Sequence, residues 1–195
     1  MEDYIQNLLH ELYESGQQSD KQEQEHGKKM LNLEPDTAQL VSMLVRSSQR
    51  KNLLEIGTSN GYSTIWLAWA AHSTGGRVIS IDRDEQKLWQ ADINLRQANL
   101  REFVELFHGN ATEIVADFPG PFDFVFFDAD RISAPKQLAL LIPKLTPNVF
   151  VLADNVLSHP DEIAGYLTAI KEAPGFEHMV VPVGKGLSIA YRNIV

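Results

Sequence analysis

The stretch "LLEIGTSNGYST", residues 53–64, decides the expected fold of this 195-residue chain. It begins as an apolar run typical of a buried strand, passes through a turn with two glycines and continues into a helical pattern. Gly57 and Gly61 allow the backbone to turn sharply and to approach a ligand closely. A strand, a glycine turn and a helix in this order are typical of ligand-binding units in α/β folds.

Two acidic residues accompany this turn. Glu55 stands where the dinucleotide pattern G-x-G-x-x-G would have its first glycine, and Asp82 ends the next strand in "ISIDRD". An acid at Glu55 would repel a pyrophosphate but suits cationic groups, such as the amino group and sulfonium of S-adenosylmethionine. An acid at the position of Asp82 accepts hydrogen bonds from ribose hydroxyls in nucleotide-binding folds. For the glycines alone, a plain strand–helix turn is the alternative interpretation.

Downstream of the turn, short apolar runs alternate with helical patterns. The expected strands are 52–56, 77–81, 103–107, 122–127, 149–153, 178–183 and 186–192. Fully apolar strands that alternate with helices indicate a mostly parallel sheet covered by helices on both faces. The last two strands are joined by Gly184-Lys185-Gly186, which reads as a hairpin turn and adds an antiparallel edge. The prediction is therefore an α/β fold with a mostly parallel seven-stranded sheet.

The residues before the sheet form a helical extension. Ile5, Leu8, Leu9 and Leu12 share one face of an opening amphipathic helix, and a second helix is expected to begin at Asp36 as its N-cap. The polar stretch 15–29 between them reads as a solvated helix or mobile linker, or alternatively as a flexible lid. We expect one domain over 1–195, with an extension at 1–48 and an α/β core at 49–195.

Composition narrows the class of protein. A net charge of −9 argues against nucleic acid or an anionic membrane as a partner, because both require a basic surface. The absence of cysteine excludes disulfides, thiolate catalysis and zinc–cysteine or iron–sulfur sites. With no signal-peptide pattern or long apolar segment, we expect a cytoplasmic protein. Trp66, Trp69 and Trp89 on expected helices, together with the first helix, suggest a homodimer.

Five motifs in order resemble those of the catechol O-methyltransferase-like, S-adenosylmethionine-dependent O-methyltransferases, especially the small bacterial members. They are "LLEIGTSNGYSTIWLA", "VISIDRD", "HGNATEI", "FDFVFFDAD" and "VLADNV", and "GKGLSIAYR" is similar to the terminal strand of that group. The resemblance covers about residues 30–192. It implies a Rossmann-like class I methyltransferase fold and a homodimer.

The resemblance also implies roles for individual residues. Glu55, Gly57 and Ser63 would lie against the methionine part of the cofactor, and Asp82 would bind its ribose, with Arg83 beside it. Gly109, Asn110 and Ala111 would border the adenine. Asp128, Asp154 and Asn155 would be the three protein ligands of a divalent metal, with Asp128 also expected beside the cofactor and among the catalytic residues.

The positions of these three residues in the sequence also indicate a metal site. Asp128 ends one expected strand and Asp154 the next, and the carboxyl ends of neighbouring parallel strands lie at one edge of a sheet. Two carboxylates and an amide oxygen form a hard site that favours Mg²⁺, Mn²⁺ or Ca²⁺. Alternatively, Asp154 and Asn155 only end the strand by bonding to nearby backbone.

The sequence departs from the family at the position of the base. Family members carry a lysine three residues after the first metal aspartate, and Arg131 stands there in "DADRISAP". Arginine has no acceptor lone pair and does not deprotonate in proteins, so it is not a general base. It is either a fixed catalytic charge or a surface cation. His159 is a possible replacement base, and Ser188 stands where animal members carry an acceptor-binding glutamate.

These observations predict an S-adenosylmethionine-dependent O-methyltransferase, assisted by a divalent metal, that acts on a small hydroxylated, catechol-like acceptor. The alternatives are a metal-independent methyltransferase with another acceptor and a cofactor-binding protein without catalysis. A nicotinamide-dependent oxidoreductase is disfavoured by the missing glycine pattern.

Overall fold

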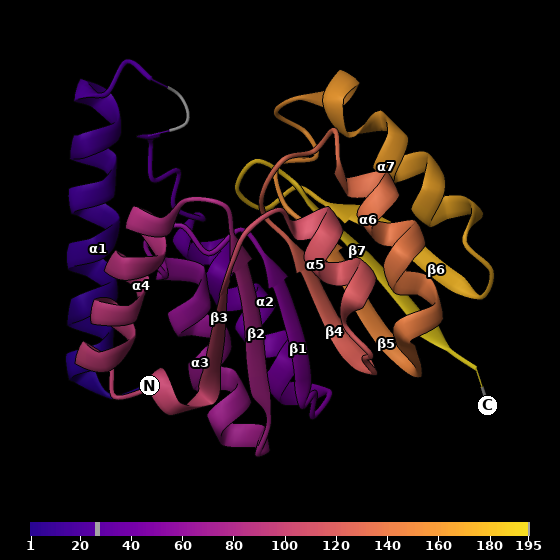
Figure 1. The fold of residues 1–195 in the computed structure, drawn as a ribbon, viewed down its shortest axis with the longest axis horizontal. Coiled ribbons are helices and arrows are strands. Elements are labelled where there is room, and N and C mark those ends of the chain that lie inside the picture. Colours follow the sequence, from indigo (N-terminus) through magenta and orange to yellow (C-terminus); the bar gives the residue numbers. More distant parts are fainter. Residues whose placement is uncertain (26–27, 195) are drawn as a thin grey trace.

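A computed structural model describes residues 1–25 and 28–194 (Figure 1). Fourteen helices and strands, together with the short 3₁₀ turns Arg101–Phe103 and Ile142–Lys144, follow one another along this part of the chain. They are α1 (Asp3–Gln22), α2 (Pro35–Ser47), β1 (Asn52–Ile56), α3 (Tyr62–Thr74), β2 (Arg77–Asp82), α4 (Glu85–Gln97), β3 (Val104–His108), α5 (Ala111–Asp117), β4 (Phe122–Phe127), α6 (Ala134–Leu141), β5 (Leu145–Ala153), α7 (Pro160–Glu172), β6 (Phe176–Val181) and β7 (Leu187–Asn193).

The strands form one sheet in the order β3-β2-β1-β4-β5-β7-β6. The first five strands are parallel, whereas β7 is antiparallel to both β5 and β6. This confirms the predicted sheet and its terminal antiparallel hairpin. The strand order reverses between β1 and β4, and in open α/β sheets the crevice at such a reversal binds ligands.

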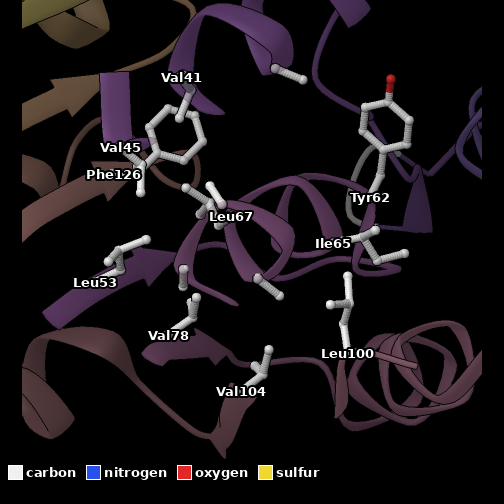
Figure 2. Packing of buried hydrophobic residues seen from close by; sticks show 14 of the residues in the cluster. Val41, Val45, Leu53, Tyr62, Ile65, Leu67, Val78, Leu100, Val104 and Phe126 are labelled. Carbon is white, nitrogen blue, oxygen red and sulfur yellow. The ribbon is translucent and has the colours of Figure 1, made fainter. Parts of the chain in front are cut away.

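Helices cover both faces of the sheet, as predicted (Figure 1). Successive residues of a strand point to opposite faces, so Leu53 joins the cluster under α1–α4 while Leu54 joins the cluster under α5–α7. Phe124 and Phe126 likewise face the first cluster, and Val125 faces the second. Figure 2 shows Leu53 and Phe126 packed with Val41, Val45 and Leu67. Strands that are apolar on both faces are thus explained by two hydrophobic layers.

The N-terminal helices share the core of the sheet. α1 buries Ile5 and Leu9, and α2 buries Val41 and Val45, in the same cluster as Leu53. The opposite side of α1 is polar, and across the described residues no helix combines the length and apolar character that a membrane span needs.

Some predicted boundaries are wrong by a few residues. α1 runs to Gln22, so the first part of the polar stretch 15–29 is helical, which agrees with one of its predicted interpretations, while residues 26 and 27 lie outside the described residues. α2 has Glu34, not Asp36, at its N-cap position, because Pro35 suits the first helical turn. β6 is 176–181 and not 178–183, and Pro182, which has no N–H to donate, follows its end.

Candidate active site

The predicted site residues meet at the carboxyl edge of the parallel strands. Four of them follow directly after a strand, and the backbone N–H of each donates to a carbonyl at or next to the end of a neighbouring strand. These bonds are Gly109 N to Asp82 O (2.9 Å), Gly57 N to Ile81 O (2.9 Å), Asp128 N to Ile56 O (2.8 Å) and Asp154 N to Phe127 O (3.0 Å). The sheet thus places the glycine turn, Asp82 and the two aspartates Asp128 and Asp154 in one row.

Gly57 is required by the close approach of two loops. Its φ is +109°, and a Cβ at this position would lie 2.2 Å from the carbonyl oxygen of Asp128. Gly61 adopts φ +87° at the start of α3, where a Cβ would lie 3.1 Å from Ala91. Both glycines therefore allow backbone conformations and contacts that a larger residue would strain.

Glu55 is fully buried beneath the glycine turn. Its carboxylate accepts hydrogen bonds from the hydroxyls of Ser63 (2.6 Å), Thr64 (2.5 Å) and Ser80 (2.5 Å). Burial raises the pKa of Glu55 to about 7, although these hydroxyls oppose the rise. The acid thereby ties β1, α3 and β2 together behind the turn.

Asp82 is fixed at the end of β2. Its carboxylate accepts from the backbone N–H of Ser59 (2.8 Å) and of Asp84 (2.9 Å). Asp82 pairs in register with His108, whose ring nitrogen bonds to the carbonyl of Arg83 (3.1 Å). Gly109, Asn110 and Ala111 follow at the end of β3, and the Asn110 side chain caps α5 through Thr112 N–H (2.9 Å). The predicted ribose and adenine residues are therefore neighbours.

A segment of the N-terminal extension crosses the glycine turn. The carbonyl of Met30 accepts from the Ser59 hydroxyl (2.8 Å), and the carbonyl of Lys29 accepts from the Lys87 ammonium (2.6 Å). Asp20 of α1 accepts from the backbone N–H of Met30 (2.7 Å) and Leu31 (2.9 Å). The first part of the polar stretch 15–29 is thus the largely exposed end of α1, in line with the solvated-helix interpretation, and the chain after it lies against the glycine turn and α4.

Asp128, Asp154 and Asn155 follow Phe127 and Ala153, which pair in register on β4 and β5. Asp154 is only 4% exposed. Burial, with a contribution from the Asp154 charge, raises the pKa of Asp128 well above its usual range, and burial raises that of Asp154 to about 7. Asn155 has φ +64°, a left-handed conformation that asparagine tolerates better than most residues.

Two cations flank these carboxylates, each in an ion pair. Arg131 pairs with Glu162 of α7 (2.8 Å) and lines, with Asp154, a small cavity between the strand ends and α6–α7. Lys185, in the turn between β6 and β7, pairs with Glu34 at the start of α2 (2.9 Å). Sequence reasoning took Lys185 only as part of a hairpin turn, because its proximity to Glu34 depends on residues far apart in the chain.

The remaining candidate residues lie outside this row or are engaged elsewhere. His159 is exposed before α7, and its Nδ1 bonds to the Ser158 hydroxyl (2.9 Å). Ser188 is fully buried and bonds to His178 (2.9 Å). Trp66 and Trp69 pack against the core, whereas Trp89 is 67% exposed.

The donor set at the aspartates fits a hard cation. One Asp154 oxygen, Oδ1, is buried and has no hydrogen-bond partner among the described residues. Two carboxylates on adjacent strand ends, of which that of Asp154 is buried, repel each other unless protonated or neutralised. No cluster of three or more His, Asp or Glu side chains suited to a metal occurs within residues 1–25 and 28–194. An ion here would therefore also need the Asn155 oxygen and oxygens from solvent or a ligand.

This sheet order, with β7 inserted antiparallel between β5 and β6 and a glycine turn at the reversal point, is the Rossmann-like class I methyltransferase fold. An O-methyltransferase from Bacillus cereus, solved in complex with SAH, superposes with a TM-score of 0.83. It is 26% identical in sequence, and the match covers 96% of this chain and 91% of that structure.

Residues 54–156 match the family described as "Methyltransferase domain". The chain belongs to this methyltransferase family, and its similarity to catechol O-methyltransferases confirms the resemblance in its motifs. The relative from Niastella koreensis is 33% identical over 137 residues, which are 68% of this chain and 62% of the relative. That from Mycobacterium tuberculosis is 34% identical over 116 residues, 59% of this chain and 52% of the relative. The matches thus span between half and two thirds of these two proteins.

Proposed function

We propose that this protein is an S-adenosylmethionine-dependent O-methyltransferase that acts on a small hydroxylated, catechol-like acceptor. The observation that carries the proposal is the row of Asp82, Gly57, Asp128 and Asp154 along one sheet edge, at the point where the strand order reverses. The catechol O-methyltransferases among its relatives and the SAH-bound Bacillus cereus enzyme support the reaction and its methyl donor.

The proposed cofactor site runs from the glycine turn to the end of β3. Gly57 would allow the backbone to lie against the methionine part, while Asp82 would accept hydrogen bonds from the ribose hydroxyls. Glu55 already accepts from three hydroxyls, so we assign it to holding Ser63 and the turn in place. Arg83 and Gly109–Ala111 would border the ribose and adenine.

A divalent ion, Mg²⁺ or another hard cation, is proposed at Asp128, Asp154 and Asn155. The buried Oδ1 of Asp154, which lacks a hydrogen-bond partner among the described residues, and the position of Asp128 at the adjacent strand end support a cation there. When bound, such an ion would polarise the acceptor hydroxyl as a Lewis acid. The protein itself would hold the acceptor oxygen in line with the methyl group, and such positioning accounts for a large share of catalysis in displacement reactions.

The acceptor hydroxyl must lose its proton during transfer. Arg131 is not suited to take it, and its ion pair with Glu162 holds the guanidinium as a fixed charge. We therefore propose that the acceptor ionises before transfer and that Arg131 stabilises the resulting anion. His159 is the second candidate for a base.

A pH–rate profile tests this account of the proton. On two catechols of different acidity, turnover should rise with pH and favour the more acidic one. Arg131→Lys should raise activity near neutral pH, because a lysine amine partly buried beside a bound metal ion can have its pKa lowered into the working range. Full wild-type activity at pH 7 on the less acidic catechol, with no gain in Arg131→Lys, would contradict it. His159→Ala would then be the next variant.

Calorimetry and a methyl-transfer assay test the function itself. The chain should bind S-adenosylmethionine and S-adenosylhomocysteine and not NAD, and Asp82→Ala should weaken binding by about 1–3 kcal/mol. Chelation of divalent ions, or Asp154→Ala, should abolish transfer to a catechol while cofactor binding persists. Transfer that survives both changes would favour a metal-independent enzyme, and cofactor binding without transfer to any acceptor would favour a non-catalytic protein.

A further inference from the structure

The turn between β6 and β7 brings Lys185 to the acceptor side of the site. β7 runs antiparallel to β5, with Ser188 paired to Ala153, so the turn lies at the edge where β5 ends. The carbonyl of Lys185 accepts from Leu157 N–H (2.9 Å), and that of Gly186 accepts from Val156 N–H (3.0 Å). These two bonds fix the backbone of Lys185 against the segment that directly follows Asp154 and Asn155.

The side chain of Lys185 is held and yet accessible. It is 48% exposed, and it pairs with the Glu34 carboxylate through Oε1 at 2.9 Å. An ammonium has three donors, and this contact uses one of them. Glu34 stands at the N-cap position of α2, where the helix dipole also stabilises its negative charge. The pair thus holds the lysine side chain in place while that side chain stays partly exposed.

Lys185 is suited to bind a negative group and not to remove a proton. Although burial opposes it, the hydrogen bond and charge of Glu34 and the charges of Asp154 and Asp128 raise its pKa above the usual value. A lysine that stays protonated at neutral pH acts as a fixed cation. The other cation near the carboxylates, Arg131, is 18% exposed and paired with Glu162, and it is already assigned to the ionised acceptor oxygen, so Lys185 is the candidate for a second anionic group.

Apolar side chains on the neighbouring loops favour an aromatic ligand. Leu157 is 56% exposed and contacts the Lys185 turn, where a Cβ on Gly186 would lie 2.4 Å from Leu157 Cγ. Ile132, in the loop after Asp128, is 73% exposed. An exposed leucine and isoleucine on the two loops that carry the aspartates provide apolar surface for a ring.

We propose that Lys185 determines acceptor specificity by binding an anionic substituent, a carboxylate on the aromatic ring that is methylated. Glu34 positions the lysine and does not contact the acceptor. This inference rests on the proposed function, since it assigns the acceptor class of the same site.

Three acceptors with the same ring and different charge test the proposal: 3,4-dihydroxybenzoate, 3,4-dihydroxybenzyl alcohol and 3,4-dihydroxybenzylamine. Wild type should prefer the benzoate over the alcohol in kcat/KM, and the amine should be poorest. Lys185→Met should lower kcat/KM for the benzoate on the order of tenfold, as expected for a lost charge-assisted hydrogen bond, with the alcohol changed less than threefold. Lys185→Arg should keep the preference.

Glu34→Gln separates recognition from a merely structural ion pair. Without the competing carboxylate, Lys185 should bind the benzoate better, so Glu34→Gln should raise the benzoate preference and Lys185→Met should lower it. The ion pair of Lys185 with Glu34 could instead only stabilise the packing of α2 against the β6–β7 turn. In that case both variants should lose activity alike on all three acceptors, and the proposal is wrong. Arg96→Met, which removes the exposed ion pair with Asp92 on α4, is the matched control and should change nothing.

Calorimetry can measure how tightly the benzoate binds in the presence of S-adenosylhomocysteine. Because this measurement does not require methyl transfer, it tests the anion site separately from the proposed function. Weaker binding to Lys185→Met with no methyl transfer by wild type would support the anion site and reject the methyltransferase activity. Equal binding to wild type and Lys185→Met, or no binding to either, would overturn the proposal.

Discussion

Gly57 is constrained both by its backbone conformation and close contact with Asp128 and by its place in the proposed cofactor site. Replacement by alanine would place a Cβ 2.2 Å from the Asp128 carbonyl in a backbone of φ +109°. We expect Gly57→Ala to lower the unfolding free energy on the order of 3 kcal/mol, because the β1 and β4 loops must separate. Urea unfolding followed by circular dichroism measures this loss.

Gly75→Ala is the control for that substitution. Gly75 also has a positive φ, +69°, but an added Cβ would meet nothing within 4 Å. Its replacement should therefore cost only about 1 kcal/mol, the ordinary penalty of a left-handed alanine. Equal losses in the two variants would show that φ alone, and not the contact with Asp128, makes Gly57 necessary.

Glu55 makes stability depend on pH. Burial raises its pKa from 4.5 to about 7, so between these values the folded protein keeps a proton that the unfolded chain has lost. The unfolding free energy should therefore fall as pH rises through this window. Glu55→Gln does not ionise and should remove a fall on the order of 3 kcal/mol, leaving the slope from Asp128 and Asp154.

Urea unfolding at pH 5 and pH 8 checks the effect of Glu55. The difference between the two pH values should be smaller in Glu55→Gln than in wild type. Glu177→Gln, an exposed glutamate of β6, should match wild type at both. If the unfolding free energy falls equally between pH 5 and pH 8 in wild type and in Glu55→Gln, Glu55 is already ionised in the folded protein at pH 5.

At the scale of elements, Asp84 both caps α4 and contacts Asp82, the acid proposed to bind the ribose, through its backbone N–H. Asp84 caps this helix by accepting from Gln86 N–H (2.9 Å) and Lys87 N–H (3.2 Å). Asp84→Ala should lower the unfolding free energy by about 1 kcal/mol, whereas Asp84→Asn keeps an acceptor oxygen and should cost less. Thermal unfolding of both variants measures the difference, and an equal loss would argue against the cap.

At the scale of the whole molecule, the N-terminal extension should unfold together with the sheet. Leu9 of α1 is 3% exposed and belongs to the cluster that contains Leu53. Leu9→Ala should lower the unfolding free energy by about 2–4 kcal/mol within a single transition. Met43→Ala, 49% exposed on α2, should change little. A separate early transition in calorimetry would mean that α1 unfolds independently.

The homodimer stays a prediction. Of the three tryptophans that motivated it, only Trp89 is prominently exposed, since Trp66 and Trp69 pack on the core and Arg46 stacks on Trp69 at 4.4 Å. Light scattering at micromolar concentration should give twice the chain mass of 21.9 kDa. A mass equal to that of one chain would reject the dimer.

The sequence alone determined the order of the elements, the parallel sheet and most of the candidate site. These follow from local patterns: apolar runs of strand length, glycines at a strand–helix turn, and acids directly after strands. Asp128 and Asp154 were predictable as neighbours because parallel strands end at one edge of a sheet. Strand and helix ends were less predictable, as at Asp36 and at β6, because capping and pairing partners decide them.

Only the tertiary structure decided which side chains meet across long separations. The contacts of Glu34 with Lys185 and of Arg131 with Glu162, and the three hydroxyls around Glu55, join elements whose spacing leaves no periodic signal. The fold of segment 29–31 over the glycine turn depends likewise on Ser59 and Lys87. Local propensity acts within a few residues, whereas such contacts are fixed only when the two hydrophobic layers pack the helices onto the sheet.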